Sequence, residues 1–382
     1  MQAPAKGFQM SDVTPVRMPK WGLSMQEGAI VEWLKAQGDT IAEGDDLVDI
    51  ETSKITNVCE SPGAGVLRRI VAKPGETLPV GALIGVLGSP AVSEADIDSF
   101  IADFQASFTP EEAAEEGATG MATTLVQAGE RSLRIARLGA AEGPPVVLIH
   151  GYSGDLNNWL FNIEALAARN PVIALDLPGH GGSTKDVADG SLKTLADSVG
   201  AMLDGLEVRQ AHLVGHSLGA AVAARLAADR PGLALSLTLI APAGLSASPV
   251  SEAFLTGIIE AQRARDLRPV LERLLADPAA VTKDMIDDIL KFKRLDGVEE
   301  ALTALRDRMV QGDDAAALRA DLAKIPSALV IASRDDQIVG PPDEAALPSH
   351  FTVAWIEGAG HMPHLEQAAE VNALLAKQIC LS

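Results

Sequence analysis

Residues 211–219 read AHLVGHSLG, and they join a short apolar run to a very tight turn. The run AHLV is typical of a buried strand, and the Ala-rich stretch AAVAARLAADRP after the turn is typical of a helix. Gly-x-Ser-x-Gly between a strand and a helix is the pattern of a nucleophile elbow, because side chains at the glycine positions would collide with neighbouring elements. The turn lifts the serine above the sheet, beside a helix N-terminus that favours developing negative charge. We therefore predict that Ser217 is a catalytic nucleophile.

A serine hydroxyl is a weak nucleophile without a base, and the acid and the base should follow it in chain order. In ALVIASRDDQIVG, Asp335 and Asp336 come directly after an apolar strand. In FTVAWIEGAGHMPHLEQ, His361 follows the next strand on a loop that begins with glycine. We predict that His361 is the base and that Asp336, which starts an acid-x-Ile-Val pattern, is the acid. Asp335 is the alternative acid.

Two backbone N–H groups are needed to hold an oxyanion near the serine. We expect one from Leu218, directly after the nucleophile, and one from Tyr152, in the loop after the strand VVLIHG. This expectation concerns the amide of Tyr152 and gives its ring no catalytic role. Two other histidines near these segments, His180 and His216, are expected to be structural, and His364 is expected to lie on the helix that begins there.

Six short apolar runs between residues 144 and 358 alternate with helical stretches or loops: PPVVLIHG, PVIALDLPG, AHLVGHS, LSLTLIAP, PSALVIAS and FTVAWIEG. Continuous apolar runs separated by helices indicate a mostly parallel sheet with helices on both faces. With the motifs above, residues 129–382 resemble the α/β-hydrolase superfamily. A charged, helix-rich stretch at about 246–312 falls where that family inserts a helical lid, and a closed lid would exclude water from the serine.

The N-terminal part of the chain contains a pattern that is repeated after 37 residues. The first copy is Leu34, Gly38, Thr40, Ile41, Gly44, Leu47 and Ile50, and the second is Val71, Gly75, Thr77, Leu78, Gly81, Ile84 and Leu87. Each copy reads as a strand, a tight turn and a second strand. Two such halves could close a flattened all-β barrel that buries both apolar faces, with IETSKITN (50–57) as the hairpin between them. Lys54 would then stand at its tip.

Residues 14–88 resemble the lipoyl domains of 2-oxo acid dehydrogenase complexes. The stretch that carries the resemblance is VRMPKWGLSMQEGAIVEWLKAQGDTIAEGDDLVDIETSKITN. The resemblance implies that Lys54 carries lipoic acid in amide linkage. Biotinyl domains share this fold but flank their lysine with methionines, whereas the neighbours here are Ser53 and Ile55, which disfavours biotin.

Residues 89–128 contain no Lys or Arg but many acidic side chains, as expected of an extended linker that repels itself. Within it, residues 94–105 place four apolar side chains at helical spacing: Ile97, Phe100, Ile101 and Phe104. Such a stripe either packs on the neighbouring domain or forms a docking helix for a partner protein.

The composition of the 382-residue chain limits its partners. A formal net charge of -21 and only 3% aromatic residues argue against nucleic acid and against acidic membrane surfaces. The two cysteines, Cys59 and Cys380, make neither a disulfide framework nor a metal-binding spacing. There is no signal-peptide pattern and no apolar run of about 20 residues, so we expect a cytoplasmic location.

A lipoyl domain joined to an α/β-hydrolase domain resembles the dihydrolipoamide acetyltransferase component of acetoin dehydrogenase complexes. The resemblance implies an acyltransferase that moves an acetyl group from dihydrolipoyl-Lys54 to coenzyme A, as part of a homo-oligomer. It also implies two partners: a thiamine-diphosphate-dependent acetoin dehydrogenase component and dihydrolipoyl dehydrogenase. The His-x-x-x-Asp-Gly motif and the peripheral subunit-binding domain of usual acyltransferase components are not recognisable.

Two other functions are compatible with the sequence. The chain could be a serine hydrolase of esters or thioesters with an appended lipoyl domain, or a lipoyl carrier and scaffold without transferase activity. For the transferase itself, His361 could instead deprotonate coenzyme A directly, without an acyl group on Ser217.

Overall fold

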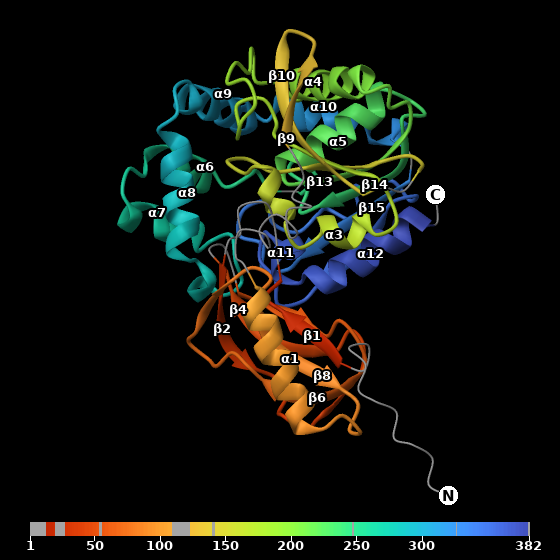
Figure 1. Cartoon of the computed structure of the whole chain (residues 1–382). Coiled ribbons are helices and arrows are strands. Elements are labelled where there is room, and N and C mark those ends of the chain that lie inside the picture. Colours follow the sequence, from red (N-terminus) through yellow and green to blue (C-terminus); the bar gives the residue numbers. More distant parts are fainter. Residues whose placement is uncertain are drawn as a thin grey trace, which may run out of the picture. The chain divides into compact units, whose positions relative to one another are not determined.

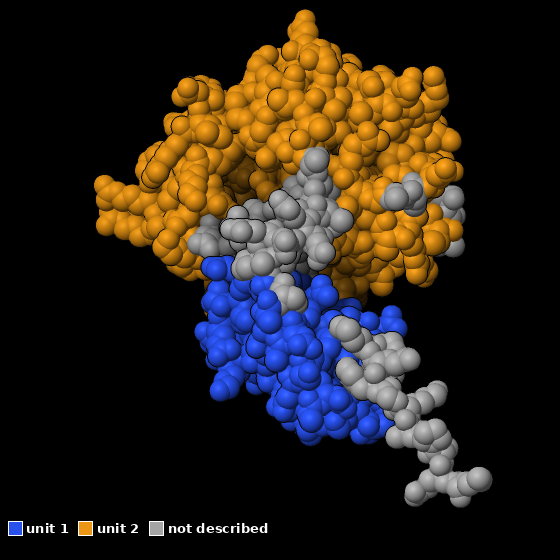
Figure 2. Space-filling view, viewed as in Figure 1, with its two compact units in different colours: residues 1–120 blue, residues 121–382 orange. Residues whose placement is uncertain are grey.

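The computed structural model describes residues 13–19, 27–52, 56–108, 123–139, 142–246, 248–325 and 327–380, without the side chains of Ser107 and Asp284. The chain divides into two compact units, residues 1–120 and 121–382, which are coloured separately in Figure 2.

The first unit contains two four-stranded antiparallel sheets, with strand orders β1-β8-β6-β3 and β5-β4-β2-β7. The strands are β1 (Val13–Arg17), β2 (Glu27–Trp33), β3 (Thr40–Ile41), β4 (Asp46–Glu51), β5 (Thr56–Glu60), β6 (Gly65–Ile70), β7 (Thr77–Pro79) and β8 (Leu83–Gly88). One apolar core joins side chains of both sheets, including Ile30 and Ile50 from one and Leu67 and Leu87 from the other. The predicted all-β fold of this region is confirmed.

The 37-residue repeat corresponds to equivalent strands and turns in the two halves of this unit. The repeat glycines Gly38 and Gly75 have φ angles of 101° and 86°, which side chains disfavour. Strands β4 and β5 pair in a hairpin in which Glu51 lies opposite Thr56. The predicted modification site, Lys54, lies between these paired residues in sequence but outside the described residues.

The acidic segment after β8 forms helix α1 (Glu94–Ser107), which belongs to the first unit. The side chain of Ser93 caps the helix by accepting a hydrogen bond from the N–H of Asp96 (3.2 Å). Ile97 and Phe100 are buried against a cluster that includes Leu83 and Val86 of β8. The apolar stripe of the helix is therefore covered by the first unit itself.

Two ion pairs hold the start of α1 on the same unit. Glu94 accepts hydrogen bonds from Arg68 (2.6 Å) and Arg69 (2.8 Å). The predicted linker, 89–128, is corrected at its C-terminal end, because Thr123–Ala128 form strand β9 of the second unit. The helix expected at 94–105 is present as Glu94–Ser107 and packs on the neighbouring domain, which is the first of its two predicted alternatives. The one-signed composition of this segment does not reveal β9, because β9 is an uncharged edge strand. It also does not reveal that α1 gains its cations from β6.

The second unit is built on an eight-stranded sheet with the order β16-β15-β14-β13-β11-β12-β10-β9. Strands β11 to β16 pair in parallel, and β9 and β10 are antiparallel at one edge. The strands are β9 (Thr123–Ala128), β10 (Arg131–Leu138), β11 (Val146–Ile149), β12 (Val172–Leu175), β13 (Ala211–His216), β14 (Ala234–Ile240), β15 (Ala328–Ser333) and β16 (Thr352–Ile356). The predicted mostly parallel sheet is confirmed.

Helices cover both faces of this sheet, as Figure 1 shows. One layer consists of α4 (Leu192–Gly205), α5 (Leu218–Asp229) and α10 (Asp313–Asp321), and the other of α3 (Ile163–Ala167), α11 (Pro363–Glu366) and α12 (Ala368–Cys380). Because the central strands are covered on both sides, β11, β12, β13 and β15 are buried along their whole length.

Four further α-helices lie between β14 and β15 in the chain, in the segment expected to act as a lid, and this segment is called the lid below. They are α6 (Glu252–Glu260), α7 (Ala264–Leu271), α8 (Lys283–Lys293) and α9 (Val298–Gln311). They gather at one side of the unit in Figure 1, where α6 packs on α7 and α9, and α8 packs on α7. The lid region expected at about 246–312 contains all four helices.

Candidate active site

Ser217 lies at the sharp turn between β13 and α5, in the backbone conformation that an elbow requires. Its φ is 54° and its ψ is -116°, a strained conformation for a residue with a side chain. The turn is closely packed: a Cβ atom on Gly219 would lie 2.2 Å from the carbonyl oxygen of Ile149, and one on Gly215 would lie 2.3 Å from that of Gly219. The two glycines of the motif are therefore required by the packing around the turn.

The structure brings Ser217, His361 and Asp336 together. The Nε2 atom of His361 lies 2.9 Å from Ser217 Oγ, and its Nδ1 atom lies 2.8 Å from Asp336 Oδ2. Because a carboxylate only accepts hydrogen bonds, Nδ1 carries the proton and Nε2 is left to accept one from the serine hydroxyl. Asp335, the alternative acid, is exposed to solvent and does not contact His361.

Asp336 is held as a carboxylate by its surroundings. Its Oδ1 atom accepts hydrogen bonds from the N–H groups of Ile338 (2.8 Å) and Val339 (3.1 Å). Burial alone would raise the pKa of Asp336, but His361 and these two N–H groups together lower it below its ordinary value. The acid-x-Ile-Val pattern thus has a physical function, because its backbone supplies both donors.

The N–H groups expected to form the oxyanion hole are unpaired among the described residues. Neither Tyr152 nor Leu218 donates its backbone N–H to another described group, although both residues are buried. The loop of Tyr152 approaches the elbow closely, since a Cβ atom on Gly151 would lie 3.0 Å from Ser217 Cβ. Buried N–H groups are rarely left without a partner, so these two are suited to receive a developing oxyanion.

The ring of Tyr152 makes a contact that its sequence position did not indicate. Its hydroxyl donates a hydrogen bond of 3.0 Å to the carbonyl oxygen of Leu302 in α9. Because α9 belongs to the lid, this bond ties the lid to the loop that offers the oxyanion donor. The exposed fraction of Ser217 is 3%, so little bulk water reaches the serine.

Two buried histidines support the loop that carries Tyr152. His180 Nε2 accepts a hydrogen bond from the N–H of Ser153 (3.1 Å), and His150 Nε2 accepts one from Leu177 (2.9 Å). Burial lowers the pKa of both rings, that of His180 to about 3, so each is neutral and can accept at Nε2. His180 therefore positions the loop and does not reach the serine.

The main chain of His361 is held from two sides. Its carbonyl oxygen accepts a hydrogen bond from His216 Nε2 (2.8 Å), and its N–H donates to the carbonyl oxygen of Leu274 (2.7 Å). His216 is the variable residue of the elbow motif, whereas Leu274 lies in the lid between α7 and α8. His361 is thus attached both to the elbow of Ser217 and to the lid. His364 is buried behind it, with its ring 4.5 Å from that of His216.

Glu366 reinforces the connection between the lid and the histidine loop. Its Oε1 atom accepts hydrogen bonds from Gly360 (2.8 Å) and Met362 (3.3 Å), and its Oε2 atom accepts one from Ala276 in the lid (2.7 Å). A Cβ atom on Gly360 would lie 2.7 Å from Leu274 O, which shows how closely the two segments pack. Sequence reasoning missed Glu366, whose only signal is its place five residues after the histidine.

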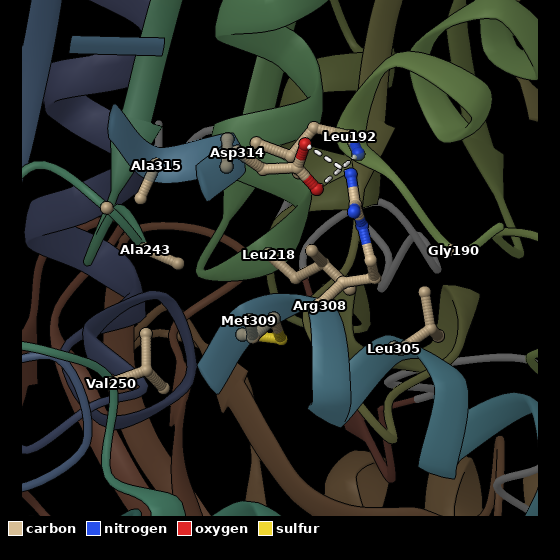
Figure 3. A pocket seen from close by; sticks show the side chains of 12 residues that line it. Gly190, Leu192, Leu218, Ala243, Val250, Leu305, Arg308, Met309, Asp314 and Ala315 are labelled. Carbon is tan, nitrogen blue, oxygen red and sulfur yellow. Dashed lines mark hydrogen bonds and ion pairs between the residues drawn. The ribbon is translucent and has the colours of Figure 1, made fainter. Parts of the chain in front are cut away.

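An apolar pocket lies beside Leu218, between the core and the lid (Figure 3). Leu218 and Ala221 of α5 line it on the core side, and Leu305 and Met309 of α9 line it on the lid side. Its only cation, Arg308, is paired with Asp314 at 3.0 Å. The pocket therefore suits an apolar group and not an anion.

Other kinds of site find no support in the described part of the chain. No group of three or more His, Cys, Asp or Glu side chains among those residues could hold a metal ion. No helix within the same ranges is long and apolar enough to cross a membrane.

Replacing Glu366 by Gln should slow the reaction of Ser217 with a fluorophosphonate probe by about 10- to 100-fold. One amide cannot accept from Ala276, Gly360 and Met362 together, so the loop of His361 should shift away from the serine. The rate of probe labelling measures this effect directly. The exposed Glu370→Gln variant is the matched control, and equal labelling rates for the two variants would contradict the positioning role.

Comparisons with known proteins agree with this geometry. Residues 14–87 match the family model described as "Biotin-requiring enzyme", and residues 146–374 match the "Alpha/beta hydrolase family". In solved structures, a meta-cleavage product hydrolase of Pseudomonas fluorescens IP01 aligns with a TM-score of 0.60 and 24% identity, over 67% of this chain and 97% of that chain. This likeness concerns the fold of the second unit.

Curated relatives match nearly the whole chain. A protein of Pseudomonas putida is 46% identical over 95% of this chain and 97% of its own length, and a protein of Cupriavidus necator is 42% identical over 96% and 97%. Both carry the name "Dihydrolipoyllysine-residue acetyltransferase component of acetoin cleaving system". The family expected from the combined domains is confirmed, and the chain belongs to the dihydrolipoyllysine-residue acetyltransferase components of acetoin cleaving systems.

Proposed function

We propose that the second unit transfers an acetyl group from a dihydrolipoyl thioester on Lys54 to coenzyme A through Ser217, His361 and Asp336. The observation that carries this proposal is the hydrogen-bonded serine, histidine and aspartate in a chain that also contains a lipoyl domain. The lipoyl group supplies a flexible arm whose thiol holds acetyl as a thioester. The paired residues Glu51 and Thr56 of β4 and β5 fit such an attachment, because they close a short hairpin around position 54.

In the first half of the reaction, His361 Nε2 takes the proton of Ser217, and the serine oxygen attacks the thioester carbonyl. The N–H groups of Tyr152 and Leu218 stabilise the oxyanion, while Asp336 keeps the other ring nitrogen of His361 protonated. The carbon–sulfur bond then breaks, and His361 returns the proton to the departing thiolate. Ser217 is left as an acetyl ester.

In the second half, His361 takes the proton from the thiol of coenzyme A, and the sulfur attacks the acetyl ester. The carbon–oxygen bond breaks, and Ser217 regains the proton from His361. Transfer prevails over hydrolysis only if the thiol arrives before water does. The burial of Ser217 and the bond from Tyr152 to the lid at Leu302 support such exclusion of water. In the alternative mechanism no acetyl-serine forms, and His361 deprotonates the thiol of coenzyme A directly.

The chain is a component of an acetoin cleaving system, and we propose its partners from that setting. A thiamine-diphosphate-dependent enzyme would load the acetyl group, and dihydrolipoyl dehydrogenase would reoxidise the arm. A homo-oligomeric, cytoplasmic assembly of this chain would serve both. The covered stripe of α1 leaves only the polar face of that helix for a docking role.

A serine hydrolase of esters or thioesters is the second candidate function. The apolar pocket beside Leu218 favours it, because acetyl alone would not need such a pocket. A lipoyl domain argues against it, since a free esterase has no use for a swinging arm. The scaffold alternative is opposed by the intact hydrogen bonds of His361.

With acetyl-dihydrolipoamide and coenzyme A as substrates, the wild-type chain should form acetyl-coenzyme A as the main product. The Ser217→Ala variant should be slower by about 10⁴-fold or more, because nucleophile and base act as a unit. Thioester and free acetate are measured together by chromatography. Ser349→Ala, which changes an exposed serine, is the control. Free acetate as the dominant wild-type product would favour the hydrolase.

Lys54→Arg should abolish acetoin-dependent formation of acetyl-coenzyme A in the reconstituted complex, because arginine cannot form the lipoyl amide. The same variant should turn over free acetyl-dihydrolipoamide at the wild-type rate. Lys73→Arg, an exposed lysine of the same unit, is the matched control. Unchanged acetoin-dependent activity in the Lys54→Arg variant would refute the carrier role of that residue.

A further inference from the structure

Coenzyme A carries a 3′-phosphate and a diphosphate, and a chain with a net charge of -21 repels such a molecule over most of its surface. Its phosphates therefore need a local group of cations near the active site. Residues 291–294, KFKR, are the one place in the sequence where three of four consecutive residues are basic. They form the C-terminal end of α8 in the lid and the residue after it.

The aromatic residue of this stretch connects it to the active site. The ring of Phe292 stacks on that of His180 at 6.3 Å, with an angle of 13° between their planes. Since His180 accepts the N–H of Ser153, it supports the loop in which the neighbouring Tyr152 offers the oxyanion donor. Phe292 therefore packs on a residue that supports the active-site loop, and Lys291 and Arg294 lie within two residues of Phe292 in the chain.

A third exposed cation comes from the neighbouring helix, which runs antiparallel to α8. At one end of the pair, Lys293 donates to the carbonyl oxygen of Ala261, and at the other end Arg268 donates to that of Val281 (2.9 Å). Arg263, the N-cap of α7, thus lies beside the C-terminal end of α8. The positive end of the α7 dipole also offsets the negative end of α8 there.

Three side chains of this group form no close ion pair among the described residues. Lys293 is buried by its bond to the α6–α7 junction, but Lys291, Arg294 and Arg263 are exposed and form no ion pair with any described residue. Asp287, one turn earlier on α8, is paired with Lys283, and its charge also interacts with those of Lys291 and Arg294, which leaves the group with more cations than nearby ion-pair partners. The pocket of Figure 3 offers no alternative for phosphate, because Asp314 neutralises Arg308 and the remaining lining is almost entirely apolar.

We propose that Lys291, Arg294 and Arg263 bind the phosphates of the 3′-phospho-ADP part of coenzyme A, so that its thiol-bearing arm extends towards Ser217. This inference rests on the proposed function, in which coenzyme A is the acetyl acceptor. It assigns recognition of the acceptor to the lid, and the reacting groups to the core.

The experiment compares coenzyme A with pantetheine, which has the same thiol arm but no phosphate. For the Lys291→Glu/Arg294→Glu variant, with acetyl-dihydrolipoamide as donor, the KM for coenzyme A should rise by about tenfold or more. The KM for pantetheine and the kcat with either thiol should stay within about twofold of wild type, because the catalytic groups are untouched. The rise should shrink at high ionic strength.

Arg169→Glu/Lys377→Glu is the matched control, because it reverses one exposed arginine and one exposed lysine on the body of the unit. This variant should leave the KM for coenzyme A unchanged. An unchanged KM in the lid variant, or an equal rise for pantetheine, would overturn the phosphate site. If the KM for coenzyme A rose only when the acetyl donor is carried on the lipoyl domain, the phosphate site would also be overturned. The cations would then serve in docking of the lipoyl domain. If wild-type protein acetylates neither thiol, the proposed function itself fails.

Discussion

The hydrogen bond of 2.9 Å between His361 Nε2 and Ser217 Oγ joins two segments that are 144 residues apart in sequence. This bond depends on the parallel sheet, in which the carboxyl ends of β13, β15 and β16 lie on the same side, so that the loops after these strands meet there. It depends equally on the main chain of His361, which is bonded to His216 on the core side and to Leu274 on the lid side. The geometry of the base is therefore set by the elbow and the lid together.

This double attachment suggests how a hydrolase fold can serve a transferase. Hydrogen bonds join the lid to the active site at Tyr152, His361 and Glu366: Leu302 accepts the hydroxyl of Tyr152, Leu274 accepts the N–H of His361, and Ala276 donates to Glu366. Opening of the lid would break the contacts that position His361 at the same time as it admits water. Water would therefore reach an acyl-serine mainly when His361 is out of position to activate it. The lid would also carry the recognition of the acceptor, which couples thiol binding to closure.

The local patterns of the chain were sufficient to predict the fold and to single out Ser217, Asp336 and His361, which the structure brings together. The elbow glycines, the acid-x-Ile-Val pattern and the chain order of Ser217, Asp336 and His361 each express a nearby backbone requirement, which a sequence displays directly. Glu366, the hydroxyl of Tyr152 and the end of the linker at β9 could not be found in this way. Each depends on a partner far along the chain, and an uncharged edge strand such as TTLVQA has no strong pattern of its own.

If the acetyl group passes through Ser217, an acetyl ester on that serine should be trapped within one turnover. Wild-type protein is mixed with one equivalent of isotopically labelled acetyl-dihydrolipoamide, quenched in acid within one turnover, and mapped by peptide mass spectrometry. We expect labelled acetyl on Ser217, and its transfer to acetyl-coenzyme A when coenzyme A is added before the quench. Formation of labelled acetyl-coenzyme A at the full rate with no label on Ser217 at any time would contradict transfer through Ser217.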